Sequence, residues 1–440
     1  MTATWKTKPL RDLADIRVSN VDKKTLPSER PVHLCNYMDV YANEYVTADH
    51  SFMAATATRN EIQKFGLRLG DVMITKDSES PDDIGVPSVI VDEIDNLVCG
   101  YHLALMRPKL NEICPVYLAK QLAAAEAKRY FGINASGSTR FGIPIGAIES
   151  FELPLPELPE QSKIAEVLST VDRAIAQTEA LIAKQQRIKT GLMQDLLTRG
   201  IDQHGNLRSE ATHAFKDSPL GRIPVEWGVR SLGVALGEAR GFLQTGPFGS
   251  QLHAHEYTHT GIPVIMPQDI LHGRVSTAII ARIPKKRAND LRRHCVVEND
   301  IIFSRRGDLT RAAAIRPRET GWLCGTGCFL LRVSSGKMSA KWLAHLYRHH
   351  WIQRQIETNS VGSTMPSLNN GVMSQLVAPF PNVDEQHVIA DRADAMGTEI
   401  ESLKKRRKKL RSLKTGLMQD LLTGKVRVTP LLEQAKEATA

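Results

Sequence analysis

The residues best suited to chemistry in this chain are hydrogen-bond donors placed in glycine-bearing loops. In the run Ser304-Arg-Arg-Gly-Asp-Leu-Thr-Arg311, Arg305, Arg306 and Arg311 surround a glycine turn that follows a short apolar segment. A guanidinium presents parallel N–H donors that match guanine O6 and N7 or a phosphate. We therefore predict that this loop contacts nucleic acid.

Further loops carry donors of the same kind. Residues 244–251 form a Gly/Pro loop with amides and hydroxyls, 137–140 and 362–364 are Gly-Ser-Thr loops whose hydroxyls suit phosphates, and 76–78 takes the place of 304–306 in the first half. A solvated turn is the alternative for each loop. The predicted DNA-contacting residues are Lys76, Ser78, Ser138, Thr139, Arg140, Gln244, Thr245, Ser250, Gln251, Gln268, Arg305, Arg306, Arg311, Ser363 and Thr364.

Motifs for catalysis or metal binding are not found in the sequence. There is no Gly-x4-Gly-Lys-Ser/Thr phosphate loop, no Asx-Pro-Pro-aromatic tetrapeptide of base methyltransferases, and no metal-nuclease pattern after Pro81-Asp82. His253, His255 and His259 lack the helix-spaced glutamate of HExxH. The six cysteines form no CxxC pair, so we interpret them as reduced thiols. We predict no catalytic residues and no metal site.

Charge is distributed unevenly along the chain. Residues 1–157 hold 17 basic and 21 acidic side chains, whereas residues 218–382 hold 20 basic and 10 acidic ones. The second segment is therefore typical of a polyanion-binding domain, and the first must use a local basic surface if it binds DNA. No apolar run is long enough to span a membrane and no signal peptide is found, so we expect a cytoplasmic protein.

An internal repeat organises the whole sequence. The ten residues 189–198 return unchanged at 414–423, an offset of 225. Glu160-Gln161 returns as Glu385-Gln386 at the same offset, and Cys99-Gly100 returns as Cys324-Gly325. Two copies of one unit, with diverged globular parts and similar helical parts, suggest one task performed on two targets.

Each copy ends in a long amphipathic segment. Alternating steps of four and three residues trace a mainly apolar seam, which is typical of a coiled coil. Each helix would be roughly 60 Å long. The simplest packing is one helix against the other, and the alternative is that each covers its own globular part. The seams are Ile164, Leu168, Val171, Ile175, Thr178, Ile182, Gln185, Lys189, Leu192 and Leu196, and Ile389, Ala393, Met396, Ile400, Leu403, Arg407, Leu410, Lys414, Leu417 and Leu421.

The globular parts mix strands with helices. Short β-rich runs such as 71–75, 88–91, 300–303 and 329–333 are separated by Gly, Pro and Asp, and one helical stretch follows in each copy. The predicted fold is α/β (mixed α+β): two globular domains joined by two long helices packed as an antiparallel coiled coil, with an internal pseudo-two-fold repeat.

Taken together, these features resemble the specificity (S) subunit of Type I restriction-modification systems. The resemblance rests on Glu160-Gln161 and Ile164-Ala165 after a proline-rich exit, on residues 191–197, and on their copies at 385–390 and 416–422. Residues 215–227 resemble the entry to a second target-recognition domain. The resemblance covers essentially the whole chain.

The resemblance implies that two target-recognition domains each read half of a bipartite DNA site. The helices would act as a ruler and dock two methyltransferase (M) subunits, and restriction (R) subunits would join for cleavage. S-adenosylmethionine, ATP and Mg would be bound by those partners and no cofactor by this chain. The implied boundaries are 1–157 for domain 1, 158–200 for helix 1, 201–217 for the linker, 218–382 for domain 2, 383–424 for helix 2 and 425–440 for the tail. The implied partner-binding residues are Gln161, Ile164, Leu192, Met193, Leu196, Gln386, Ile389, Leu417, Met418 and Leu421.

Three other hypotheses remain open at this stage. A self-sufficient DNA methyltransferase or nuclease would need a cofactor pocket that no motif indicates. A structural coiled-coil or adhesin-like repeat protein would not account for the ten excess basic residues at 218–382. An orphan specificity subunit that has lost its activity would share every feature described above.

Overall fold

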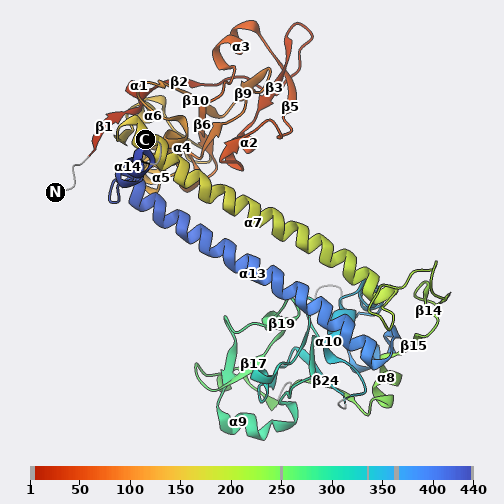
Figure 1. Ribbon diagram of the computed structural model, residues 1–440. Coiled ribbons are helices and arrows are strands. Elements are labelled where there is room, and N and C mark those ends of the chain that lie inside the picture. The colour runs from red at the N-terminus through yellow and green to blue at the C-terminus, as the bar shows by residue number, and fades with distance from the viewer. Residues whose placement is uncertain (1–4, 248–250, 334–335, 361–365, 438–440) are drawn as a thin grey trace. The chain divides into compact units, whose positions relative to one another are not determined.

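The structure is a computed structural model that describes residues 5–247, 251–333, 336–360 and 366–437. The chain divides into unit 1, Met1–Ala180 with Lys405–Ala440, and unit 2, Leu181–Lys404. Each unit contains a mixed α/β domain and one part of each long helix, α7 (Leu158–Thr198) and α13 (Val383–Leu422) (Figure 1).

Unit 1 is built on two small sheets. One has the strand order β2-β10-β6-β8-β4 and the other the order β5-β3-β9, in which β3 and β9 are parallel. The strands are β1 (Lys6–Pro9), β2 (Ala14–Val18), β3 (Arg30–Cys35), β4 (Tyr45–Val46), β5 (Met53–Ala57), β6 (Val72–Thr75), β7 (Asp77–Ser78), β8 (Pro87–Ile90), β9 (Leu97–Cys99), β10 (Leu103–Pro108), β11 (Phe141–Gly142) and β12 (Glu152–Leu155). The shorter helices are α1 (Leu10–Leu13), α2 (Tyr37–Tyr41), α3 (Arg59–Phe65), α4 (Pro115–Leu122), α5 (Ala125–Asn134), α6 (Ile145–Glu149) and α14 (Thr429–Glu437).

Unit 2 repeats this plan. Its sheets have the orders β16-β24-β21-β22 and β20-β17-β23, and β17 and β23 are again parallel. The strands are β13 (Phe215–Lys216), β14 (Ile223–Pro224), β15 (Gly228–Ser231), β16 (Phe242–Thr245), β17 (Ile262–Ile265), β18 (Ile270–Leu271), β19 (Arg274–Val275), β20 (Ala281–Ile283), β21 (Ile301–Ser304), β22 (Ala312–Ala314), β23 (Leu323–Cys324), β24 (Cys328–Arg332) and β25 (Val377–Phe380). The shorter helices are α8 (Leu232–Glu238), α9 (Lys285–Asp290), α10 (Ala340–Tyr347), α11 (His350–Asn359) and α12 (Asn370–Gln375).

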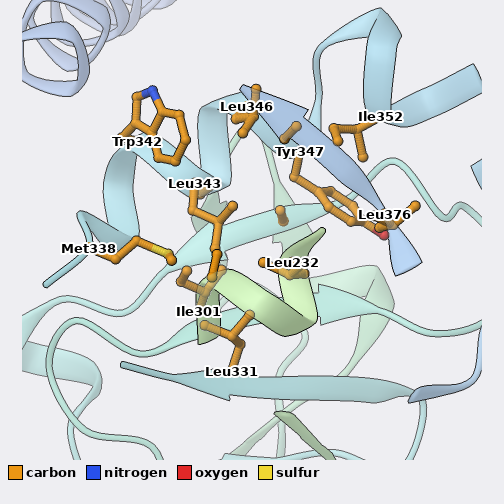
Figure 2. Packing of buried hydrophobic residues seen from close by; sticks show 14 of the residues in the cluster. Leu232, Ile301, Leu331, Met338, Trp342, Leu343, Leu346, Tyr347, Ile352 and Leu376 are labelled. Carbon is orange, nitrogen blue, oxygen red and sulfur yellow. The ribbon is translucent and has the colours of Figure 1, made fainter. Parts of the chain in front are cut away.

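The main core of unit 2 lies between α10 and its sheet. Ile301 and Leu331, from neighbouring strands, are fully buried, and Trp342, Leu343 and Tyr347 of α10 pack in the same cluster (Figure 2). In unit 1 the corresponding cluster joins strands and α4 to both long helices, because it contains Ile164 and Leu168 with Leu421 and Leu422. Each domain is therefore bound to the helix pair by burial of apolar area.

The long helices pack against each other in antiparallel fashion in both units. In unit 1, Arg411 pairs with Glu179 at 2.6 Å and Lys414 with Asp172 at 2.7 Å, so residue numbers fall on one helix as they rise on the other. In unit 2, Gln185 donates to Glu399 over 3.1 Å. Every seam position predicted from the sequence is buried or half-buried. The predicted fold class is confirmed.

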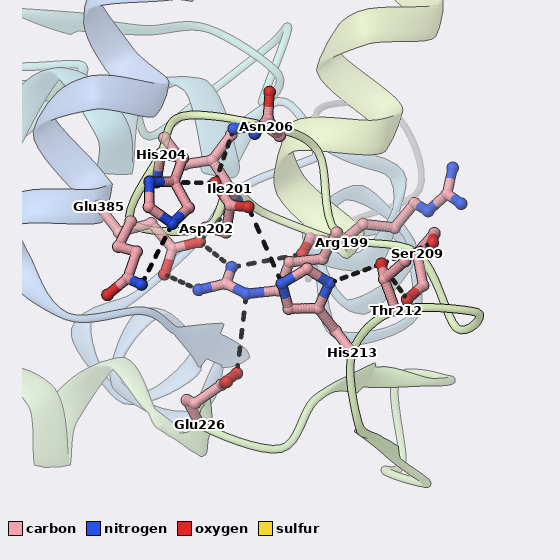
Figure 3. Close-up of polar contacts among 12 residues, drawn as sticks. Arg199, Ile201, Asp202, His204, Asn206, Ser209, Thr212, His213, Glu226 and Glu385 are labelled. Atoms are coloured by element: carbon pink, nitrogen blue, oxygen red, sulfur yellow. Dashed lines mark hydrogen bonds and ion pairs between the residues drawn. The ribbon is translucent and has the colours of Figure 1, made fainter.

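A buried carboxylate fixes the start of each long helix. Glu385 of α13 accepts hydrogen bonds from Arg208 and from the backbone N–H of Ile201, the latter at 2.9 Å (Figure 3). It also accepts from the indole N–H of Trp227 at 3.2 Å. Gly200, with φ of +64°, ends the neighbouring helix, and a Cβ there would meet Glu385 at 2.2 Å. Only glycine fits this turn.

Unit 1 has the same arrangement of residue types, but the residues come from different parts of the chain. Glu160 accepts two hydrogen bonds from Arg427, at 2.6 and 2.7 Å, and the Arg427 guanidinium lies 5.4 Å from the centre of the Trp5 ring. Gly424, with φ of +71°, packs against the same indole. We call the two groups of a helix-start glutamate, an arginine, a tryptophan and a glycine the helix-end clamps.

We expect Glu385→Gln to lower the free energy of unfolding of unit 2 by roughly 3–5 kcal/mol, because buried Arg208 would keep only the exposed Glu226, at 3.8 Å, as a counterion. Glu210→Gln is the matched control, since Glu210 and its partner Arg222 are 56% and 54% exposed and an exposed pair contributes less than about 1 kcal/mol. Four of the five tryptophans lie in unit 2, so urea unfolding followed by tryptophan fluorescence measures both changes. Equal losses in the two variants would contradict the role of the clamp.

His349 makes unit 2 sensitive to acid. Its Nε2 donates to Gln194 Oε1 over 3.0 Å, and its Nδ1 accepts from the backbone N–H of Trp351, so the ring is held neutral. Burial, together with the neighbouring His350, lowers the pKa of His349 from 6.5 to about 4. Between these values the unfolded chain binds more protons than the folded chain, so stability is complete above pH 6.5 and is lost as pH falls.

Lowering the pH from 7 to 5 is therefore expected to remove about 2 kcal/mol through His349. His349→Gln keeps a donor and an acceptor but does not titrate, so its unfolding free energy should fall less over the same interval. Urea unfolding at pH 7, 6 and 5 measures the difference. The prediction is wrong if wild type and variant lose stability in parallel.

Candidate nucleic-acid interface

The structure brings together loops that are distant in sequence at the end of a central strand in each unit. In unit 1, β6 leads into β7, and β7 pairs with β11, which follows the loop 136–140. In unit 2, β21 leads into Arg305 and Arg306, and Arg306 forms a β-bridge with Ser367. The amide of Leu368 donates to the carbonyl of Arg305. Both units thus place the loop after a central strand beside the segment that follows a Gly-Ser-Thr sequence.

Unit 1 has a cavity of about 860 Å³ beside these paired loops. Tyr37 and Tyr41 of α2 stack in it with ring centres 5.6 Å apart, and Met38 beside them is largely exposed. Stacked rings and an exposed methionine form an apolar surface that suits the face of a base or an apolar base edge. The cavity is lined by Lys23, Asn36, Tyr37, Met38, Asp39, Tyr41, Ser51, Phe52, Met53, Asp77, Ser78, Glu79, Asp83, His102 and Arg140.

A chain of polar contacts sets the charge of this cavity. Lys76 lies 2.8 Å from Asp77, and His102 Nδ1 donates to the same carboxylate over 2.5 Å. Burial raises the pKa of Asp77, but the hydrogen bonds from Lys76 and His102 outweigh it and hold that pKa below its ordinary value. Arg140 donates to His102 Nε2 over 3.0 Å. Lys76 is therefore neutralised, and Arg140 is the exposed cation of the group.

The predicted residues of unit 1 fall into three positions. Ser78 and Arg140 line the cavity, and Ser138 and Thr139 lie exposed in the loop just before Arg140. Lys76 does not line the cavity and is held in its ion pair with Asp77. Tyr37, Tyr41 and His102 also line the cavity and are not among the residues predicted from the sequence. The spacing of two tyrosines four residues apart, one helical turn, was a signal for a shared face.

The predicted arginines of unit 2 differ in their exposure and in the contacts that they already make within the chain. Arg306 is exposed, whereas Arg305 is half-buried, donates to the carbonyl of Leu368 over 3.2 Å, and has its pKa lowered by burial and by Arg306. Arg311 pairs with Asp308 at 2.8 Å and donates to the carbonyl of Pro267 over 3.0 Å. This contact brings exposed Gln268 next to Arg311.

The remaining predicted positions of unit 2 are less accessible or not described. Gln244 donates to the carbonyl of Arg293 over 2.6 Å, and Thr245 and Gln251 are half-buried. Ser250, Ser363 and Thr364 lie outside the described residues. Contact of all these residues with DNA stays a prediction.

The predicted partner-binding residues are mostly internal to this chain. Gln161 accepts from the backbone N–H of Cys114 and donates to the carbonyl of Pro156, both over 2.9 Å, and Gln386 does the same with Ser339 and Pro381. Leu192, Met193, Leu417 and Met418 are half-buried, and Ile164, Leu196, Ile389 and Leu421 are buried. Most of these side chains hold the helices in place, and their contact with a partner stays a prediction.

Over the described part of the chain, no group of three or more His, Cys, Asp or Glu side chains is arranged to hold a metal ion. All six cysteines are free, and burial raises the pKa of Cys35, Cys99, Cys324 and Cys328. Within the same residues, no helix is long and apolar enough to cross a membrane.

Comparison with known proteins agrees with this architecture. The family model described as Type I restriction modification DNA specificity domain matches residues 2–186 and 253–412. The chain is 26% identical over 438 residues to a candidate type I restriction enzyme MjaX specificity subunit of Methanocaldococcus jannaschii, covering 96% of this chain and 94% of that protein. It is 24% identical to the MjaVIII specificity subunit of the same organism, covering 64% of each.

The fold is also found in a solved structure. The crystal structure of the Type I restriction-modification S subunit from M. genitalium aligns with a TM-score of 0.59 at 16% identity, covering 96% of this chain and 97% of that one. The chain belongs to the family of Type I restriction-modification specificity subunits, and the resemblance recognised in the sequence is confirmed.

Proposed function

We propose that this chain is the non-catalytic DNA-specificity subunit of a Type I restriction-modification complex, in which each α/β domain reads one half of a bipartite site. Membership in the family supports this proposal. The observation that carries it is that both units pair the segment after a central strand with a segment distant in sequence, with exposed Arg140 next to this pair in unit 1 and exposed Arg306 within it in unit 2.

The two domains would differ in how much contacts to base edges and contacts to phosphates contribute to DNA binding. In unit 1, the cavity combines one exposed arginine with stacked tyrosines and several carboxylates, so specific contacts to base edges contribute more than attraction to phosphates. In unit 2, exposed Arg306 lies in a segment with ten excess basic residues, and contacts to phosphates contribute more. The domain boundaries we assign are 1–157 and 218–382.

The partners and the chemistry follow from the same proposal. Leu181, Ile188 and Leu413 are large apolar side chains on the long helices, and each is at least 40% exposed. Such positions suit the docking of two methyltransferase subunits, and restriction subunits would join for cleavage. S-adenosylmethionine, ATP and Mg would be bound by those subunits and not by this chain.

We further propose that α7 and α13 set the spacer between the half-sites. The seam side chains fix the register of one helix against the other. In this proposal the length of the paired helices determines the separation of the two domains along DNA.

The test is a base-resolution map of N6-methyladenine in a methylation-free host that expresses this chain with its methyltransferase subunit. We expect a two-part motif with a fixed spacer that disappears when this chain is omitted. In the same assay, Arg306→Ala is expected to relax one base of a single half-site, because loss of a two-pronged arginine contact removes about 1–3 kcal/mol of discrimination.

Lys128→Ala is the matched control for Arg306→Ala, since Lys128 is an exposed cation on α5, outside the paired segments and the long helices. It should leave both half-sites and the spacer unchanged. Methylation without any motif, in the presence of a soluble complex, would refute the proposed function. Relaxation of both half-sites by Arg306→Ala would contradict the assignment of one half-site to each domain.

The helix spacer gives a separate prediction. Inserting one heptad after Ala180 and one after Lys404 preserves the seam and lengthens the pair by about 10 Å, or about three base pairs. The motif should keep its half-sites and gain a longer spacer. An insertion in α7 alone breaks the pairing and is expected to abolish methylation. New half-sites with the old spacer would contradict this role of the helices.

A further inference from the structure

Two lysines related by the internal repeat lie in opposite electrostatic environments. Lys414, in unit 1, contacts Glu44 at 2.5 Å and Asp172 at 2.7 Å. Lys120 of α4 contacts the same two carboxylates and is almost completely buried. Two ammonium groups and two carboxylates therefore form a neutral, largely buried network between the domain of unit 1 and its parts of the long helices.

Lys189, the repeat counterpart of Lys414, makes no hydrogen bond or ion pair with any residue that the structure describes. It is half-buried on α7 in unit 2. Burial lowers the pKa of Lys189, and the charge of Arg348 lowers it further. A partly desolvated ammonium without a counterion is unfavourable.

The repeat explains what is different in unit 2. The carboxylate of Asp172 has no counterpart, because the position 225 residues later is Gly397. Lys120 corresponds in the same way to His345. Glu44 lies just before β4, which pairs with β8. Arg274 takes the corresponding place in unit 2, because it begins β19, which lies against β22. Counterparts of the Asp172 and Glu44 carboxylates are thus both absent from unit 2, and the cation Arg274 replaces Glu44.

A cavity of about 370 Å³ lies at this place in unit 2, between β18–β19, α10 and the long helices. Arg348 faces it, and its Nε is buried with no hydrogen-bond partner among the described residues. The volume lies in the range of small-ligand sites. The titratable groups that line the cavity are Lys189, His272, Arg274, His345, Arg348, Asp394, Glu401 and Lys404.

The acidic residues of the cavity already have partners. Arg348 donates to His345 Nδ1 over 2.9 Å, so the ring carries its proton on Nε2 and donates to Asp394 over 3.0 Å. Lys341 approaches the same carboxylate at 3.5 Å. Glu401 accepts from Lys404 over 2.9 Å. Lys189, Arg274 and Arg348 therefore form no ion pair with a carboxylate among the described residues, and only the longer-range attraction of Asp394 and Glu401, whose oxygens are bonded elsewhere, acts on them.

We propose that this cavity of unit 2 is a binding site for a phosphate-type oxyanion, either free inorganic phosphate or the phosphate group of a nucleotide. The anion takes the place of the carboxylates of Asp172 and Glu44 in the first repeat. Lys189, Arg274 and Arg348 supply ammonium and guanidinium donors to its oxygens, which is the donor set that phosphate prefers. A dianion matches the excess of cations over carboxylates in the cavity.

Binding of the anion would join the domain of unit 2 to its parts of the helices, as the internal carboxylates do in unit 1. Arg274 lies on β19, Arg348 follows α10, and Lys189 lies on α7. A ligand held by three elements of the native state stabilises that state in proportion to its concentration.

Titration calorimetry of the full chain tests the site, with inorganic phosphate, AMP and ATP as probes at constant ionic strength in chloride. We expect saturable binding of one phosphate per chain and a shift of the fluorescence-detected urea transition to higher urea. Tighter binding of AMP or ATP than of phosphate would identify a nucleotide as the source, and equal or weaker binding would identify the free ion.

Gly397→Asp is the decisive variant, because it restores the carboxylate that the first repeat has at this position. A Cβ at Gly397 meets only the flexible end of Lys189, at 3.1 Å. We expect phosphate affinity to fall by about tenfold or more and the phosphate-free protein to resist urea better than Gly397→Asn. The asparagine variant has the same shape and similar helix propensity without the charge, and it should still bind.

Arg306→Ala separates this site from the proposed DNA interface, and it should leave phosphate affinity unchanged. The proposal is overturned by absence of saturable binding of all three probes. It is also overturned by equal phosphate affinity in Gly397→Asp and Gly397→Asn, which would place the bound ion elsewhere. Neither outcome bears on the methylation map, so the two proposals fail independently.

Discussion

The buried carboxylate in the first turn of each long helix is the interaction on which the rest of the structure depends. Glu385 and Glu160 are both nearly inaccessible to water, and each is bonded to an arginine from another segment. A buried charge is tolerated only when its partners are all in place. The clamp therefore fixes the end of one helix, the start of the other and a tryptophan of the adjoining segment at the same time.

The apolar seam and the domain cores pack onto helices whose ends are held by these clamps. Once the helix ends are aligned, the side chains at steps of four and three residues meet across the pair, and α4 and α10 pack their domains onto it. Surface loops are free to diverge because none of these contacts involves them. This separation explains how the two units share a sheet plan and differ in the charges that they present.

Features encoded by local pattern were predictable from sequence. The repeat, the helix seams and the mixed strands and helices follow from residue type and spacing, and they led to the correct fold class and family. The cavity of unit 1 did not, because Tyr37, Asp77, His102 and Arg140 are separated by 25 residues or more and meet only through strand pairing. Sequence also gave no sign that Asp77 neutralises Lys76, or that Gln161 and Gln386 turn inward to bond backbone groups.

The contact of Trp5 with Gly424 and Arg427 means that the beginning and the end of the chain meet in unit 1. In unit 2 the same three types of residue are joined through the continuous segment that runs from Gly200 to Trp227. One clamp is built from residues of a single continuous segment and the start of α13, and the other from residues that are far apart in the sequence. A circular permutant with its ends joined in unit 1 and opened at the exposed turn around Gln203 would meet the same packing requirements.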